Sequence, residues 1–180
     1  MGAVNHHLVS IYLNDHFAGS TNSRELVHRA AGNNRSSEYG AYLLELSQEI
    51  DEDHATLLAL MQELHVGVDH MKLVGGWVAE KAGRLKLNGS LVSYSPLSRV
   101  VELEGLMLGV DGKRRMWVAL DQISAGEPVL CTAGLPDLIV RADHQLSGLE
   151  RQHRRAMVEA LGSEKPAAHD SARSETSDFP

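Results

Sequence analysis

Apolar residues recur at intervals of three and four along four long stretches of the chain, with polar residues between them. This spacing predicts amphipathic helices, because residues three or four positions apart share one face of a helix. The predicted long helices cover residues 4–31, 37–66, 96–124 and 135–161, and a shorter helix is predicted at residues 69–86. The pattern therefore predicts an all-α fold.

Residues at the predicted helix ends support these boundaries. Ser95 is a natural N-cap and Pro96 a natural first-turn residue for the third long helix. That helix also contains three glycines, Gly105, Gly109 and Gly112. Because each glycine weakens a helix by about 1 kcal/mol relative to alanine, we expect a kink or break near residues 110–113.

The connections between the helices predict how the helices pair. The first two long helices are joined by a short loop and the last two by a fairly short connection, so each pair should form an antiparallel hairpin. About 30 residues separate the hairpins, and a connection of that length needs a helix of its own. The sequence therefore predicts a four-helix bundle: two antiparallel helical hairpins joined by a helix-bearing crossover.

Polar residues interrupt the apolar faces of the long helices. In the helix at 37–66, the stretch EIDEDH turns Glu52 to solvent and places Asp53 and His54 on the two shoulders of the apolar stripe. Asp53 also falls where a heptad-like series expects an apolar residue. The other long helices carry polar residues on or beside their apolar faces as well: Asp15, Glu104, Glu150 and His153.

These polar residues need partners, because a buried charge without one is strongly destabilising. One alternative is a metal-free network of Asp–His or Glu–Arg hydrogen bonds that fixes the register of the helices. The other is a metal site, since carboxylates and imidazoles are suitable ligands for iron or manganese. Basic stretches such as GKRRMW, residues 112–117, are expected to be solvated faces that pair with nearby acids.

Two of the helices carry a carboxylate three residues before a histidine: ERQH at 150–153 and DEDH at 51–54. Two further stretches, YLNDH and VELEG, offer a carboxylate on each of the other two long helices. These motifs resemble the ferritin-like superfamily, whose di-iron members have a Glu on two helices and Glu-x-x-His on the other two. The chain looks like uncharacterised bacterial members of that superfamily. The resemblance implies a ferritin-like four-helix bundle with six metal ligands: Asp15, Asp51, His54, Glu104, Glu150 and His153.

The resemblance also implies roles for these ligands in a non-haem di-metal site at mid-bundle. Glu104 would bridge two iron or manganese ions, Glu150 and His153 would hold one ion, and the remaining three ligands would hold the other. Such a site would support oxidase or metal-handling chemistry. Aspartate replaces glutamate at two of the positions, which would leave a wider site or a single metal position.

Composition and charge narrow the class of protein. Hydrophobic residues make up 43% and charged residues 23%, as in soluble globular proteins, and an aromatic content of 4% disfavours a β-sandwich or barrel. The net charge of −7 argues against a general nucleic-acid binder, which has to neutralise phosphates. A single cysteine, Cys131, excludes a disulfide framework within the chain. With no signal-peptide or membrane-span pattern, we expect a cytoplasmic protein.

The sequence predicts one helical domain at residues 1–161 and a disordered tail at residues 162–180, which are polar and nearly without apolar side chains. Besides the metal site, two functions stay open. One is a non-catalytic interaction or scaffold module, including self-association into a homodimer. The other is a small-molecule pocket between helices. The sequence indicates neither a substrate nor a reaction.

Overall fold

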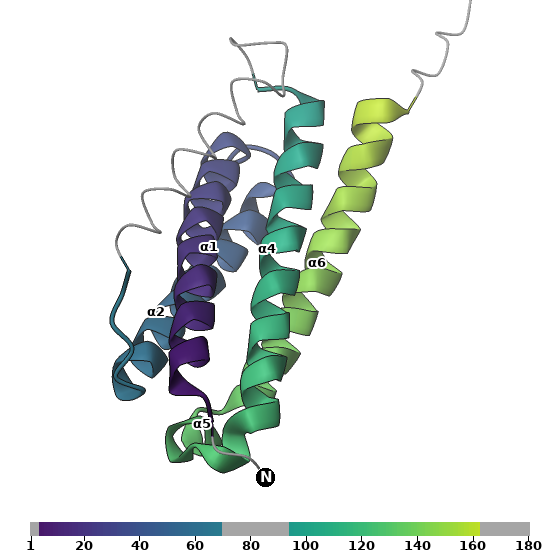
Figure 1. The fold of residues 1–180 in the computed structure, drawn as a ribbon. Coiled ribbons are helices and arrows are strands. Elements are labelled where there is room, and N and C mark those ends of the chain that lie inside the picture. The colour runs from purple at the N-terminus through teal and green to yellow at the C-terminus, as the bar shows by residue number, and fades with distance from the viewer. Residues whose placement is uncertain (1–3, 70–93, 163–180) are drawn as a thin grey trace, which may run out of the picture.

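The computed structural model describes residues 4–69 and 94–162, and within these two ranges the regular elements are all helices (Figure 1). The all-α prediction is confirmed. The predicted short helix at 69–86 and the predicted tail at 162–180 lie outside the described ranges, apart from Asp69 and Gly162. No helix in those ranges has the length and apolar character that a membrane span requires.

Helices α1 (His6–Asn33) and α2 (Gly40–Glu63) form the first antiparallel hairpin. The Asn5 side chain caps α1 by accepting a hydrogen bond from the Leu8 amide at 3.2 Å, which satisfies one of the free N–H groups of the first turn. At the other end, the side chain of buried Asn34 donates to a carbonyl of the last turn at 2.8 Å. The observed helix ends agree with the predicted ones to within about three residues, as is usual at helix ends.

Helices α4 (Pro96–Ile123) and α6 (Leu135–Leu161) form the second antiparallel hairpin. The predicted cap is confirmed, because the Ser95 hydroxyl accepts a hydrogen bond at 3.1 Å from the backbone amide three residues later. The connection contains a short 3-10 helix, η1 (Ser124–Gly126), and a short α-helix, α5 (Pro128–Thr132). The hydrophobic pattern did not predict these two elements.

Helix α4 runs without a break through residues 110–113, so a break at this point is excluded. Two of its glycines instead allow α1 to approach closely. A Cβ atom at Gly109 would lie 2.4 Å from Ser23 Oγ on α1, and one at Gly105 would lie 3.0 Å from a Leu26 methyl carbon. The packing gained at these positions offsets the low helix propensity of glycine.

The two hairpins pack against each other through α1 and α4, which also run antiparallel. Arg29 of α1 donates to Glu102 of α4 at 3.0 Å. Tyr39, the residue before α2, donates to Glu159 of α6 at 2.7 Å, and Gln145 of α6 donates to Glu49 of α2 at 2.9 Å. The end of α2 and the beginning of α4 lie at opposite ends of the helices (Figure 1). Helices α2 and α4 therefore run in the same direction.

Two clusters of buried apolar side chains form the core. One includes Leu43 of α2 and Leu103 of α4, and the other includes Leu60 of α2 and Trp117 of α4. Along α2 the clusters are separated at Asp53, which is buried although it is charged. The heptad-like series predicts an apolar residue at position 53, and the residue found there, Asp53, does lie inside the bundle.

The buried face of α1 differs from the predicted one. Asp15 is exposed and Leu8 is 59% exposed, whereas Leu13 and Phe17 are buried. The prediction that Asp15 lies on an apolar face is therefore wrong. The middle of α1 has few large apolar residues, so the sequence pattern defines its buried face poorly. The predicted face, which was set by Leu8, is rotated away from the face that packs on α2 and α4.

Candidate functional site

A carboxylate from α2 is buried between two cations at the middle of the bundle. The Asp53 side chain is 3% exposed, its Oδ2 accepts a hydrogen bond from Lys113 of α4, and its Oδ1 accepts one from Arg141 of α6. Three helices that are distant in sequence therefore meet at one carboxylate. The opposite charges compensate one another, which is what a buried ion needs in order to be tolerated.

Gln145 of α6 extends this network. Its Nε2 donates to Asp53 Oδ2 at 3.1 Å and to Glu49 Oε2 at 2.9 Å, and its Oε1 accepts from Lys113 Nζ at 2.5 Å. Burial lowers the pKa of Lys113 below its ordinary value of 10.5, against the Asp53 carboxylate, which raises it. The network is built from fixed charges of the protein itself.

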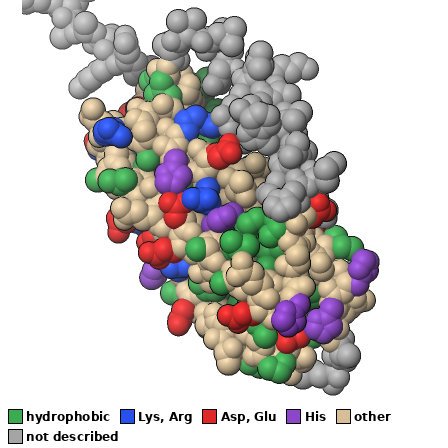
Figure 2. All heavy atoms as spheres, turned by 90° about the vertical axis from the view of Figure 1, so that its left-hand side faces the viewer, with side chains coloured by type: hydrophobic (Ala, Val, Ile, Leu, Met, Phe, Trp, Pro, Cys, Tyr) green, Lys and Arg blue, Asp and Glu red, His purple; other side chains and the backbone are tan. Residues whose placement is uncertain are grey.

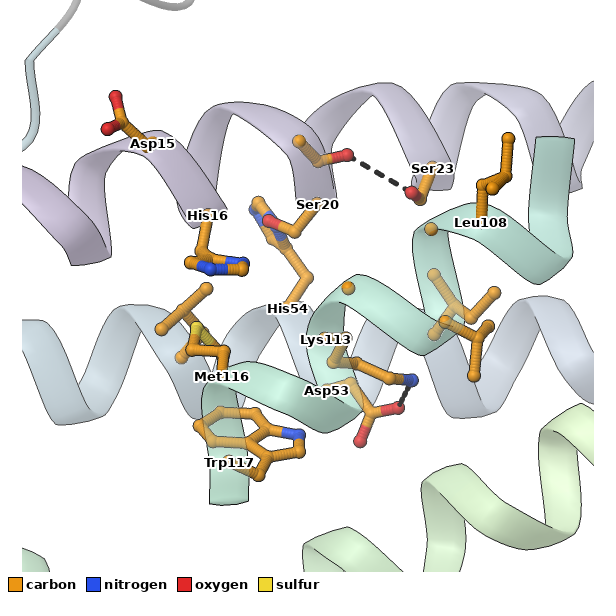
Figure 3. A pocket seen from close by; sticks show the side chains of 16 residues that line it. Asp15, His16, Ser20, Ser23, Asp53, His54, Leu108, Lys113, Met116 and Trp117 are labelled. Carbon is orange, nitrogen blue, oxygen red and sulfur yellow. Dashed lines mark hydrogen bonds and ion pairs between the residues drawn. The ribbon is translucent and has the colours of Figure 1, made fainter. Parts of the chain in front are cut away.

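A cavity of about 200 Å³ lies between α1, α2 and α4, beside this network (Figure 3). Asp53 and Lys113 contribute to its wall. The wall is mainly apolar, and its buried apolar side chains are Ile50, Leu57, Val110, Met116 and Trp117. An apolar cavity with a few polar groups is typical of small-molecule sites.

One residue of the cavity wall, Trp117, has a buried hydrogen-bond donor without a partner in the described ranges. Its side chain is fully buried, and no acceptor in the described part of the chain bonds its Nε1 atom. In Figure 3 the nitrogen-bearing edge of the indole is turned toward Asp53 and Lys113. A buried N–H group without an acceptor is rare in native proteins and costs about 1–3 kcal/mol.

Two imidazoles also line the cavity. His54 Nδ1 lies 2.8 Å from Ser20 Oγ, and its ring stacks on Phe17 with centroids 4.7 Å apart. The Ser20 hydroxyl donates its only proton to the Phe17 carbonyl at 2.7 Å, so His54 Nδ1 is the donor to Ser20. Burial lowers the pKa of both His54 and His16 below the ordinary value of 6.5, which favours the neutral form of both rings.

Three of the six predicted metal ligands come from α1 and α2: Asp15, Asp51 and His54. Asp51 binds Arg24 at 2.6 Å and His28 at 3.0 Å. On one face of the molecule, acidic, basic and histidine side chains lie next to one another (Figure 2). His54 lines the cavity, and Asp15 borders the same cavity from an exposed position.

The other three predicted ligands come from α4 and α6. His153 Nε2 lies 3.0 Å from Glu104 Oε1, so the structure brings this pair together. Glu150 instead lies 3.9 Å from an arginine of its own helix. The Glu104 and Glu150 side chains are 52% and 54% exposed, so their predicted place beside the apolar faces is wrong. Helices α4 and α6 bury the adjacent Leu103 and Leu149 instead.

As arranged, these side chains do not fit a di-metal centre. Such a centre needs carboxylates and imidazoles that converge from four helices, and residues 4–69 and 94–162 contain no group of three or more His, Cys, Asp or Glu that could hold an ion. The carboxylate buried at mid-bundle, Asp53, has both oxygens bonded to cations. The metal site stays a prediction that elemental analysis has to test.

The sequence pattern did not single out Lys113, Arg141, Gln145 or Trp117 as members of a site. Lys113 was expected on a solvated basic face, but its side chain is only 13% exposed, so that expectation is wrong. It follows Val110 by three residues and precedes Trp117 by four, which places all three on one face of the helix. That spacing was the available signal.

Comparisons of this chain with protein-family models, with curated proteins and with solved structures find no match. Its function therefore has to be inferred from its own geometry.

Proposed function

We propose that this chain is a non-catalytic binding module, a helical bundle that holds a small, largely apolar molecule in the cavity between α1, α2 and α4. The observation that carries the proposal is the cavity of about 200 Å³ with mainly apolar walls. Protein interiors keep few voids larger than a water molecule, whereas ligand sites are apolar clefts with a few polar groups. The wall has the composition of a ligand site.

The size of the cavity and the exposure of its rim support the proposal. An apolar cavity of about 150 Å³ in another protein is large enough to bind benzene, so a molecule of that class fits here. Asp15, Gly19 and Leu108 line the cavity and are themselves exposed. These three residues from α1 and α4 form the rim, where a small molecule enters from solvent.

A ferritin-like arrangement of the bundle is part of the same proposal. Two antiparallel hairpins, with α2 parallel to α4, support it. In di-iron members of that superfamily, metal ions neutralise the carboxylates at mid-bundle. In this chain Lys113 and Arg141 neutralise Asp53. Fixed cations stabilise the middle of the bundle, and ligand binding beside them needs no metal.

Toluene binding tests the proposal directly. The chain has two tryptophans, Trp77 and Trp117, so a Trp77→Phe variant reports on Trp117 alone through its fluorescence. We expect toluene to change that fluorescence saturably. We also expect it to raise the unfolding temperature, because a ligand that binds only the folded state stabilises it.

Two matched substitutions on α4 locate the binding. Val110 and Val100 are 2% and 3% exposed, but Val110 lines the cavity and Val100 packs in the core away from it. Val110→Phe should fill the cavity and abolish toluene binding. Val100→Phe should overpack the core, cost about 1–3 kcal/mol of unfolding free energy, and leave toluene binding intact. Absence of toluene binding, or binding that survives Val110→Phe, contradicts the proposal.

A further inference from the structure

His54 is held in the cavity wall by one of its two ring nitrogens. Its Nδ1 atom lies 2.8 Å from the Ser20 hydroxyl, and that hydroxyl gives its own proton to the Phe17 carbonyl. The Nδ1 atom therefore carries the proton of the neutral imidazole. The other nitrogen, Nε2, then has no proton and is a hydrogen-bond acceptor.

The Nε2 acceptor of His54 is unpaired and accessible. Within residues 4–69 and 94–162, Ser20 is the only hydrogen-bond partner of the ring. In the same ranges, the atoms that lack both a partner and accessible surface in residues that are not exposed are Trp117 Nε1 and Arg141 Nε. His54 is half-buried, and its Nε2 is not one of these two sealed atoms. Because the ring belongs to the cavity wall, a molecule that enters the cavity can reach this acceptor.

The charges around His54 preserve this acceptor. Burial and the positive charge of Arg24 lower the pKa of His54, which keeps the ring neutral, and Asp51 only partly opposes them. Asp53 is a less accessible acceptor in the same wall, because its side chain is 3% exposed and both of its oxygens bind cations. Of these two acceptors, His54 is the one open to a ligand.

We infer that the ligand is a small phenol-like molecule, whose apolar ring fills the cavity and whose hydroxyl donates a hydrogen bond to His54 Nε2. The inference rests on the proposed binding function and names the ligand class of the same cavity. The ring of the ligand packs on apolar side chains of the wall such as Ile50, Leu57 and Met116. A hydroxyl placed among such side chains needs an acceptor, because its burial without one is unfavourable.

Phenol, toluene and anisole test the inference. Toluene has a methyl group in place of the hydroxyl, and anisole keeps the oxygen but has no proton to donate. Calorimetric titration of the full chain gives the three affinities, in the unchanged protein and in His54→Phe, which keeps an aromatic ring beside Phe17 but lacks the acceptor. The affinity for phenol relative to toluene should fall about 10-fold in His54→Phe, because the hydroxyl is then buried without a partner. The affinity for anisole relative to toluene should not change.

His16→Phe is the matched control. His16 is also half-buried and lines the same cavity, but its ring packs edge-on against Tyr12 and has no hydrogen bond within the described ranges that would fix an acceptor. This substitution should leave the ratio of phenol to toluene affinity unchanged. A second measurement uses the unchanged protein and does not depend on the folding of a variant. Phenol should move the ¹⁵N resonance of His54 Nε2 upfield, as accepting a hydrogen bond does, and toluene and anisole should not.

The outcomes separate this inference from the proposed function. The inference is overturned if the ratio of phenol to toluene affinity is the same in His54→Phe as in the unchanged protein, or falls equally in His16→Phe. It is also overturned if anisole moves the Nε2 resonance as much as phenol. In these cases toluene binding still supports an apolar ligand site. Failure of both phenol and toluene to bind overturns the proposed function and the inference with it.

Discussion

The ammonium group of Lys113 on α4 is hydrogen-bonded to the carboxylate of Asp53 on α2, and only 13% and 3% of the two side chains are exposed. The two helices run in the same direction (Figure 1), and this pair of side chains connects them. Arg141 of α6 binds the other oxygen of the carboxylate. One acidic residue therefore ties α2 to two helices of the second hairpin, and it does so between the two apolar clusters.

Asp53→Ala should destabilise the bundle strongly. The change leaves the Lys113 and Arg141 cations without the carboxylate that compensates them. Breaking a buried pair by removing one partner costs about 3–5 kcal/mol of unfolding free energy. Urea denaturation followed by circular dichroism measures this cost.

Asp143→Ala is the matched control for Asp53→Ala. Asp143 pairs with Arg114, but the two side chains are 47% and 36% exposed, and such surface pairs contribute about 1 kcal/mol or less. The loss at Asp53 should therefore exceed the loss at Asp143 by at least about 2 kcal/mol. Equal losses would mean that the mid-bundle network does not stabilise the fold.

Gly148→Ala should separate α6 from α2. A Cβ atom at Gly148 would lie 2.6 Å from the Tyr42 hydroxyl oxygen and 2.8 Å from a ring carbon. The ring cannot easily move, because its hydroxyl donates to the Gln145 carbonyl at 3.2 Å. We expect the free energy of unfolding to fall by about 1–3 kcal/mol, as measured by chemical denaturation.

Gly19→Ala provides the opposite case for the same substitution. Gly19 lies within α1, and a Cβ atom there would have no heavy atom within 4 Å. Alanine should stabilise this helix by up to about 1 kcal/mol, because it favours the helical conformation over glycine. If both alanine variants change stability in the same direction, the close contact of Gly148 with Tyr42 is not what sets its cost.

The helices of this fold were predictable from the sequence to within a few residues, because the apolar spacing and the Ser95–Pro96 cap are local signals. The continuity of α4 was not predictable in this way. Gly105 and Gly109 suggest a break when only helix propensity is considered. The structure shows that they are contact points for Leu26 and Ser23 of α1, and no property of the α4 segment alone contains that information.

The candidate site was predictable only in part. Asp53 was singled out because it interrupts an apolar series, and it is buried. The two cations that bind Asp53 were not predicted. Lys113 lies in a basic stretch that was expected to face solvent, and Arg141 is not part of any recognisable motif. Glu104 and His153 do meet, but at the surface, since a small error in the assumed face of each helix moves a side chain from core to solvent.

The stability of the fold should fall as the pH drops below about 6.5. Burial lowers the pKa of His16 and of His54 below 6.5, and the positive charge of Arg24 lowers that of His54 further. The carboxylates of Asp15 and Asp51 act in the opposite direction, on His16 and His54 respectively, but burial has the larger effect. A folded-state pKa below the unfolded value means that the unfolded chain binds protons more readily. The free energy of unfolding is therefore unaffected by these groups above pH 6.5 and decreases from pH 6.5 downward.

Histidine substitutions test this pH dependence. Urea denaturation at pH 7.5 and at pH 5.5 should show a smaller pH-dependent loss of stability in His54→Gln than in the unchanged protein. His144→Gln, at an exposed position on α6, is the control and should leave the loss unchanged. Asp51 does not confound this window. Burial raises its pKa, but hydrogen bonds from Arg24 and His28 outweigh burial and hold it below 3.8, so its contribution is lost only at more acidic pH.

Elemental analysis after anaerobic reconstitution with Fe(II) or Mn(II) distinguishes a di-metal site from a metal-free network of hydrogen bonds among the polar residues at mid-bundle. A di-metal centre predicts two metal ions per chain and their loss in a Glu104→Ala, His153→Ala double variant. We expect fewer than one ion per chain, and the same amount in the double variant. The reason is that Lys113 and Arg141 already compensate Asp53, and a divalent ion beside these cations would be repelled. Two ions per chain, lost in the double variant, would instead establish the metal site. They would also require the Glu104 and Glu150 side chains to turn inward from their exposed positions.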